Sequence, residues 1–127
     1  MVQVRLEHAN ITVTNLDDTT QWLKAVFDWD LRWKGPSIYD GVSAHVGGKD
    51  SYLALYQPST MPQKGPVSYN TRAGLNHVAV VVDDLDAIEA RLKTEGFTPR
   101  SHADYEPGRR FYFEDENGIE FEVVQYD

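Results

Sequence analysis

The chain has 127 residues and a formal charge of −8, from 12 basic and 20 acidic side chains. A strongly negative protein repels phosphate backbones, so we expect no nucleic-acid partner. No apolar run reaches the roughly 20 residues of a membrane span and no signal peptide is recognisable, so we expect no membrane association and a cytoplasmic location. The lack of cysteine excludes thiolate catalysis, so any metal must take oxygen or imidazole ligands.

The elements expected in chain order form two similar halves. A β-type run that carries His8 precedes a helix, and three short strands follow; a run that carries His77 starts the same order again. We expect helices over 16–27 and 85–95, and strands over 31–33, 43–46, 51–56, 97–100, 110–113 and 119–125. The side chains of Asn15 and Asp84 are suited to cap the two helices.

This order predicts an α+β protein built from two βαβββ modules. The modules occupy residues 1–57 and 75–127, and a linker over 58–74 contains three prolines. We expect the strands of both modules to form one curved mixed β-sheet with the helices outside.

Strand alternation predicts which side chains leave the helix-covered face. His8, His77, Tyr112 and one of the glutamates Glu120 and Glu122 are expected to converge on the other face. Two imidazoles and one carboxylate form a three-ligand set for a divalent metal, with positions left for substrate or water. Each residue taken singly is more often an ordinary hydrogen-bonded or solvated side chain. The repeated position of the two histidines therefore carries the metal hypothesis.

Three stretches resemble the vicinal oxygen chelate superfamily, which includes glyoxalase I, extradiol dioxygenases, fosfomycin-modifying thiol transferases and bleomycin-sequestering proteins. They are LEHANITV at 6–13, LNHVAVVVDDLD at 75–86 and FYFEDENGIEFE at 111–122. The resemblance covers nearly the whole chain except the linker. It implies the glyoxalase/bleomycin-resistance fold.

The resemblance also implies the metal ligands. The family patterns place them at His8, His77 and Glu122, the last lying four residues after the turn glycine Gly118. Shifting the first half by 68 residues sets Ala54 on Glu122 (54 + 68 = 122), where four-ligand members such as glyoxalase I have an acid. A three-ligand site of the dioxygenase or thiol transferase type is therefore favoured over glyoxalase I.

Further roles follow from the same resemblance. Tyr112 is expected to donate a hydrogen bond to a substrate oxygen, and His102 to act as acid or base near neutral pH. The alternatives are a packed aromatic ring for Tyr112 and a solvated loop residue for His102. The gapless superposition aligns His45 with Phe113 on the helix-facing side, which leaves His45 out of the site. The substrate pocket is expected to include Asn10, Tyr52 and Tyr56.

The implied function is that of a metal-dependent dioxygenase or lyase. Such an enzyme would bind a small substrate through vicinal oxygens to iron, manganese, nickel or zinc and stabilise the resulting oxyanion. Fosfomycin chemistry ranks low because the acidic Glu106 lies in the loop that would meet a phosphonate, although Arg109 and Arg110 are basic. A non-catalytic protein of the bleomycin-resistance type, which the acidic charge suits, and a degenerate paralogue are the alternatives. Members are commonly homodimers, sometimes with modules exchanged between subunits.

Overall fold

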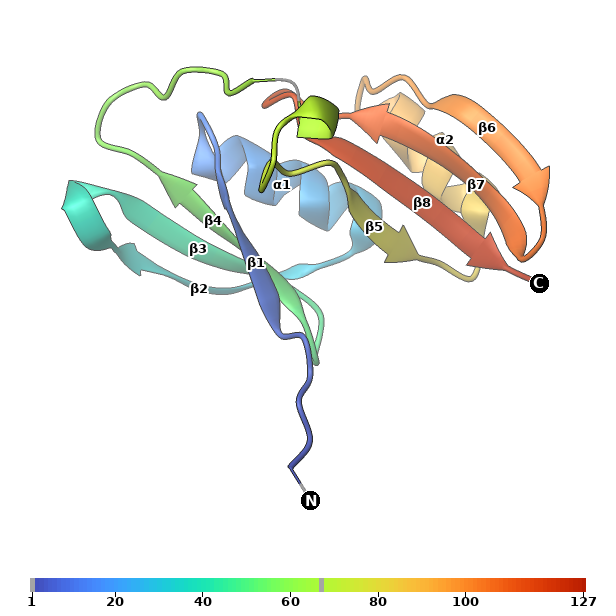
Figure 1. Ribbon diagram of the computed structural model, residues 1–127, viewed down its shortest axis with the longest axis horizontal. Helices are drawn as coiled ribbons and strands as arrows, with labels where there is room; N and C mark the ends of the chain where they lie inside the picture. The colour runs from blue at the N-terminus through green and yellow to red at the C-terminus, as the bar shows by residue number, and fades with distance from the viewer. Residues whose placement is uncertain (1, 67) are drawn as a thin grey trace. The chain divides into compact units, whose positions relative to one another are not determined.

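The computed structural model describes residues 2–66 and 68–127 and divides into two compact units, Met1–Pro62 and Gln63–Asp127. Each unit is a βαβββ module with its own four-stranded mixed sheet (Figure 1). The predicted α+β class and module order are confirmed, with two four-stranded sheets in place of one continuous sheet. The boundary between the units falls inside the predicted linker. Over the described residues, no helix is both long and apolar enough to cross a membrane.

In the first unit the sheet order is β1-β4-β3-β2, with β1 parallel to β4 and the other pairs antiparallel. One face of this sheet is buried together with the apolar side of α1. The residues that show this are almost fully buried: Leu23, Val26, Val46 and Leu55. The elements are β1 His8–Thr12, α1 Leu16–Phe27, β2 Asp30–Pro36, the short 3-10 helix η1 Ile38–Asp40, β3 Val42–Gly47 and β4 Tyr52–Gln57.

The second unit repeats this topology with the order β5-β8-β7-β6, and β5 is parallel to β8. Its core is more aromatic, because Phe111, Phe113 and Phe121 are buried together with Leu92. The elements are β5 Val78–Val81, α2 Leu85–Thr94, β6 Arg100–Tyr105, β7 Gly108–Glu114 and β8 Glu120–Tyr126, preceded by the 3-10 helix η2 Ser68–Asn70 within the linker.

Both helices begin where their capping residues predict. The side chain of Asn15 accepts a hydrogen bond from the backbone N–H of Asp18, and that of Asp84 accepts one from Ala87. These bonds satisfy amides that have no partner within the helix. The predicted start and end of α1 are both confirmed, and α2 ends one residue earlier than expected.

The strand predicted over 97–100 is wrong, because β6 begins only at Arg100. Residues 96 and 97 instead cap the C-terminal end of α2. The N–H of Phe97 donates to the carbonyl of Leu92 and that of Gly96 to Lys93, while Gly96 has a positive φ of 92°. This is the Schellman arrangement, which favours glycine. The Phe97 ring then packs at 5.7 Å from Phe113, so its apolar character serves a helix end and not a strand.

A glutamine at the end of the last strand of each module holds the start of the helix. The side-chain carbonyl of Gln57 accepts from the N–H of Leu16 at 2.8 Å, and Gln125 does the same for Leu85 at 2.8 Å. The bonds join residues 41 and 40 positions apart in the chain, at the two ends of one module. Each module therefore has its own long-range cap on the start of its helix, which local capping patterns do not reveal.

Replacing either glutamine by alanine is expected to lower the free energy of unfolding by about 1 kcal/mol, because one helix amide loses its partner. Urea denaturation followed by circular dichroism measures the change. Gln125→Glu keeps an acceptor near the helix N-terminus and should retain most of the stability. Gln21→Ala, at an exposed position of α1, is the matched control. Equal effects of Gln21→Ala and Gln125→Ala would contradict the long-range cap.

Candidate functional site

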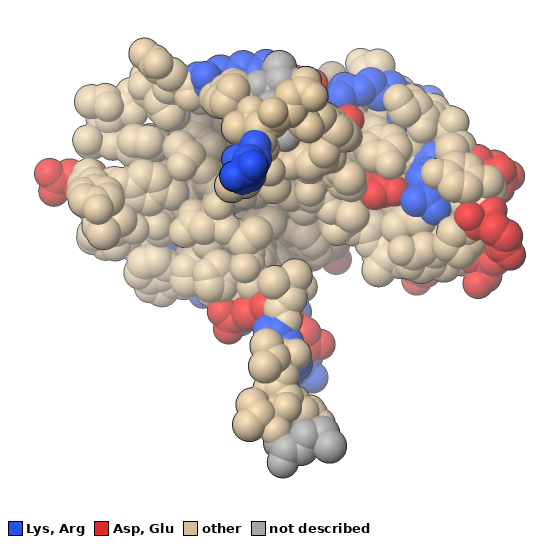
Figure 2. Space-filling model, in the orientation of Figure 1, with Lys and Arg blue, Asp and Glu red and all other residues tan. Residues whose placement is uncertain are grey.

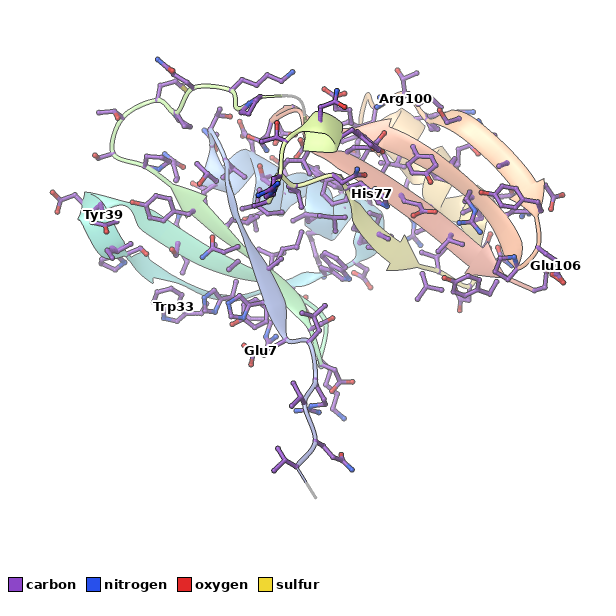
Figure 3. All side chains as sticks on the ribbon, in the orientation of Figure 1. Glu7, Trp33, Tyr39, His77, Arg100 and Glu106 are labelled. Atoms are coloured by element: carbon purple, nitrogen blue, oxygen red, sulfur yellow. The ribbon has the colours of Figure 1, made fainter. Side chains whose placement is uncertain are left out.

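His77 and Glu122 form the centre of the candidate site in the second unit. His77 lies directly before β5 (Figure 3), and Glu122 lies on β8. The Nε2 atom of His77 is 3.2 Å from Oε1 of Glu122, and their side chains are 30% and 10% exposed. Nδ1 of His77 is 2.6 Å from the side-chain oxygen of Asn76. An Nδ1–H donated to Asn76 leaves the Nε2 lone pair directed at the space beside Glu122.

This pair has the spacing of two ligands on one metal ion. Imidazole nitrogen and carboxylate oxygen bind Zn²⁺ at about 2.0–2.2 Å, and donors 90–109° apart are then about 3.0–3.4 Å from each other. The distance of 3.2 Å between Nε2 and Oε1 lies in this interval. A nitrogen and oxygen donor set also suits iron, manganese and nickel. The residues present therefore fit a divalent metal on this face.

Glu120, the other candidate acid, is engaged elsewhere. It accepts a hydrogen bond from the hydroxyl of Tyr69, and Nη2 of Arg100 lies 3.4 Å from its other oxygen. His77 is paired with Glu122. The alternative between the two glutamates, which strand alternation leaves open, is thus decided in favour of Glu122 as the neighbour of His77.

The Tyr69–Glu120 bond gives a spectroscopic prediction. The hydrogen bond to Glu120, with burial and the carboxylate charge, raises the pKa of Tyr69 to about 12. A raised pKa stabilises the fold below the ordinary tyrosine pKa of 10.0, and this contribution is lost as the pH rises through about 12. Tyr69→Phe should remove one late-titrating phenol from the tyrosinate absorbance curve. Tyr39→Phe, exposed and distant from Glu120 in the chain, should leave that late step in place.

Arg110 balances the charge of Glu122. Its Nη1 donates to Oε2 of Glu122 at 2.9 Å, and the Arg110 side chain is only 15% exposed. Burial opposes the charge of Arg110, but the hydrogen bond to Glu122 and the nearby charges of Tyr105, Glu122 and Tyr112 together raise the pKa of Arg110. The buried Nε atom of Arg110 has no hydrogen-bond partner among the described residues. The carboxylate of Glu122 therefore has one oxygen on Arg110 and the other toward His77.

Tyr112 lies on the same face, as strand alternation predicts. It is the direct register partner of Glu122, and its ring meets the ring of His77 edge-on at 5.9 Å. Burial first, and then the charge of Glu122, raises the pKa of Tyr112. The phenol therefore keeps its proton near neutral pH and is able to donate a hydrogen bond.

His8 has the corresponding place in the first unit. On β1, Asn10 pairs with Ala54, and on β5, Ala79 pairs with Glu122. His8 lies two residues before Asn10, and His77 lies two residues before Ala79, so the two histidines occupy equivalent positions. Nδ1 of His8 is 2.8 Å from Oε1 of Glu7. Each histidine thus has an acceptor on the preceding residue, which directs its Nε2 outward.

Around His8 the first unit presents a row of aromatic side chains. The Tyr52 ring stacks on His8 at 4.8 Å and on His45 at 4.6 Å, and the His45 ring lies 5.1 Å from Trp33. The guanidinium of Arg32 lies 4.5 Å from the Tyr52 ring centre. Figure 3 shows the labelled Glu7 and Trp33 along the same edge of this unit. Tyr52, expected in the substrate pocket, belongs to this row.

The predicted position of His45 on the helix-facing side is wrong. His45 pairs with Ala54 and Tyr112 pairs with Glu122, with eight residues between the first pair and nine between the second. The second hairpin is one residue longer, so a gapless superposition moves His45 to the opposite face of its strand. A comparison of the two turn lengths would have revealed this difference.

Two further pocket candidates lie on the first sheet. Tyr56 pairs with Ser43 and its hydroxyl donates to the carbonyl of Ile38 at 2.6 Å, so its polar end is already satisfied. Asn10 is exposed on the same face as Ala54, its register partner. Their contact with a substrate stays a prediction.

The structure does not bring His102 to the face of His77 and Glu122. Its Nε2 lies 2.9 Å from Oε2 of Glu89 on α2, and its ring packs against Phe111, which faces the helix. Ala103, the next residue, is the one that pairs with Arg110. A register shift in β6 turns His102 toward the helix, and its expected acid–base role at the metal is not retained.

Within residues 2–66 and 68–127, no group of three or more His, Asp or Glu side chains is gathered as a metal site. His77 and Glu122 form a pair in the second unit, and His8 belongs to the first unit. The complete three-ligand set therefore stays a prediction.

The chain thus combines two βαβββ modules, a histidine before or on the first strand of each module, and an acid on the last strand of the second. The chain matches the family model of the glyoxalase/bleomycin resistance protein/dioxygenase superfamily over residues 5–123, and it belongs to that superfamily.

Solved structures of this fold include an antibiotic-binding protein and a fosfomycin resistance protein. A glyoxylase/bleomycin resistance protein/dioxygenase domain from Frankia sp. is similar with a TM-score of 0.83, at 22% identity, over 99% of this chain and 100% of that one. The antibiotic-binding protein TnmS3 from a Streptomyces species has a TM-score of 0.75, at 20% identity, over 100% and 99%. The fosfomycin resistance protein FosX from Listeria monocytogenes, solved with Mn(II) and sulfate, has a TM-score of 0.73, at 16% identity, over 100% and 95%. These likenesses show the fold.

One curated relative matches only in part. The tRNA-cytidine(32) 2-sulfurtransferase of Citrifermentans bemidjiense is 35% identical over an alignment of 81 positions, which covers 59% of this chain. The chain spans 28% of that protein's length. So short a share of the sulfurtransferase carries no inference about activity.

Proposed function

We propose that the chain is a metal-dependent enzyme that binds a small substrate through two neighbouring oxygens to a divalent ion held by His8, His77 and Glu122. The observation that carries this proposal is the 3.2 Å separation of His77 Nε2 and Glu122 Oε1. His8, from the first unit of the same chain or of a second copy in a homodimer, would complete the set. The Mn(II) in the FosX complex, on a similar fold, supports a metal of this class.

The residues of the chain have separate tasks in this proposal. A bound divalent ion supplies Lewis acidity, which stabilises negative charge on the substrate oxygens. Asn76 orients the imidazole of His77, and Arg110 holds the carboxylate of Glu122 in place through its hydrogen bond. Tyr112, protonated because its pKa is raised, donates a hydrogen bond to a substrate oxygen and stabilises the charge that develops there.

Ala54 supports a three-ligand site over one of the glyoxalase I type. Gln57 and Gln125 cap the helices of the two units in the same way and lie three residues after Ala54 and Glu122, which makes Ala54 the first-unit equivalent of Glu122. A methyl group cannot bind a metal, so the first unit contributes one donor, His8, to the proposed ligand set. We therefore place the activity with the dioxygenase-like branch.

Elemental analysis of protein purified without chelators tests the proposal, followed by uptake of Mn(II), Fe(II), Ni(II) and Zn(II) by the metal-free protein. One equivalent of metal per chain supports it, and iron would favour oxygen chemistry over lyase or transferase chemistry. A protein that contains no metal and takes up none of these ions would contradict it.

A non-catalytic binding protein is the second candidate, and the aromatic row of the first unit favours it. Tyr52, His45 and Trp33 form a continuous row of aromatic contacts with Arg32 over Tyr52, and such a surface suits a planar ligand. The similar fold of the antibiotic-binding TnmS3 supports this reading. Quenching of tryptophan fluorescence by bleomycin in the presence of a chelator, lost in Trp33→Leu, would favour binding without metal chemistry. No quenching would count against this candidate.

A further inference from the structure

A pocket of about 540 Å³ in the second unit lies outside the candidate metal site. It is lined by residues 64–66, 69 and 71–75 and by the turn between β7 and β8. Among the described residues, neither His77 nor Glu122 belongs to its lining. Its volume is that of a pocket for a small molecule.

The pocket is locally positive in a chain of charge −8. Lys64, Arg72 and Arg100 line it, against the two acids Glu114 and Glu120. Nη2 of Arg100 lies 3.5 Å from Glu114 and 3.4 Å from Glu120, so those three residues offset one another in part. Figure 2 shows blue atoms over the linker, along the upper edge of the view.

Lys64 and Arg72 are the two cations of this lining that remain available. Neither forms an ion pair with any residue that the structure describes. An arginine fork binds a carboxylate through two parallel hydrogen bonds, and a lysine adds a point charge. The lining carries three cations against two acids, and this excess favours an anion in a protein that otherwise repels anions.

The rest of the lining is apolar. Pro66, Ala73, Leu75 and Ile119 contribute to it, and Leu75 is 42% exposed. The turn glycine Gly118 has a positive φ of 85°, and a Cβ added there would lie 3.1 Å from Cε of Lys64. A free inorganic anion would leave the apolar wall unused, whereas a carboxylate on a small apolar body would cover both parts.

We propose that this pocket binds a small aromatic carboxylate, with the carboxylate on Lys64 and Arg72 and the ring against Leu75 and Ile119. The proposal does not rest on the metal-dependent function, because the pocket shares neither metal ligand of this unit. The two hypotheses are therefore tested apart, by working with metal-free protein.

The test is a nuclear magnetic resonance titration of ¹⁵N-labelled, metal-free protein with sodium benzoate in the presence of a chelator. Saturable shifts are expected for amides of residues 72–75 and 117–120. The double variant Lys64→Ala, Arg72→Ala should weaken the apparent affinity by at least about tenfold, since both charged contacts are lost. The control Arg5→Ala, Lys49→Ala removes the same charge from the first unit and should change the affinity by less than about twofold.

A further variant separates the apolar contact from the charge. Leu75→Ala should weaken benzoate by about threefold and leave inorganic phosphate unaffected, because phosphate has no apolar surface to bury. Shifts confined to other residues, or equal weakening in the two double variants, would overturn the proposed site. Sodium phosphate that binds as tightly as benzoate would overturn the aromatic carboxylate as its ligand. The spectra themselves report whether each variant is folded.

Discussion

Glu122→Gln is expected to lower the affinity of the protein for Mn(II) by at least ~100-fold, since loss of a ligand exceeds the 10–100-fold cost of losing a partner that only orients one. The amide keeps the size of the side chain but removes the charge that attracts the metal. Isothermal titration calorimetry of the metal-free protein measures the change. His77→Ala should have an effect of the same order, because Nε2 of His77 is the neighbouring donor.

Glu120→Gln is the matched control for this experiment. Glu120 lies on the same strand and face, but its contacts are Tyr69 and Arg100. Its replacement should change the Mn(II) affinity by less than about threefold, because its charge does not contact the metal. Equal losses in Glu120→Gln and Glu122→Gln would contradict the proposed ligand set.

Glu122→Gln also affects the fold, and this effect must be separated from metal binding. Arg110 loses its charged partner while it remains mostly buried, which is expected to cost about 1–3 kcal/mol. Thermal unfolding without metal measures this cost. Arg110→Met, which removes the cation and leaves the carboxylate, should keep measurable Mn(II) binding. Complete loss of Mn(II) binding in Arg110→Met would mean that the effect of Glu122→Gln comes from the fold and not from a lost ligand.

Phe113→Ala is expected to lower the free energy of unfolding by about 3–5 kcal/mol, as for other aromatic residues removed from a core. Phe113 is fully buried, stacks on Phe121 at 5.2 Å and contacts Phe97 at 5.7 Å. Few neighbours are free to fill the space, because they belong to the sheet and to the end of α2. Urea denaturation followed by circular dichroism measures the loss.

Tyr126→Ala provides the comparison at an exposed position of the adjacent strand. Tyr126 is 56% exposed on β8, and its replacement should cost no more than about 1 kcal/mol. The three tryptophans lie in the first unit, so tryptophan fluorescence reports on that unit. Amide exchange in β7 and β8 is a more direct probe of the second unit. A loss below about 1.5 kcal/mol for Phe113→Ala would contradict the packing described for this core.

Local patterns predicted the helices because their signals lie within a few residues. Asn15 contacts an amide three residues later, and the spacing of apolar residues defines the buried side of α1. The strand over 97–100 failed for the opposite reason. The apolar Phe97 fits a strand or a helix end equally well, and its contact with Phe113 decides between them.

The candidate site was predictable only in its residue types and their repetition. That His8 and His77 are equivalent is readable in the chain, and the register agrees with it. That the neighbour of His77 is Glu122, and that Glu120 is held by Tyr69, depends on contacts far apart in sequence. Arg110 was not expected beside Glu122, although its alternation with Tyr112 on β7 placed it on the same face.

The amino-acid sequence by itself determined the two βαβββ modules, the ends of α1 and the repeated histidines, because capping and periodicity are short-range. Only the tertiary structure decided which residues share a face: His45 beside Tyr52, and His102 against Glu89 on α2. The reason is strand register. One extra residue in a turn, or one shift within a strand, sends a side chain to the opposite side of the sheet.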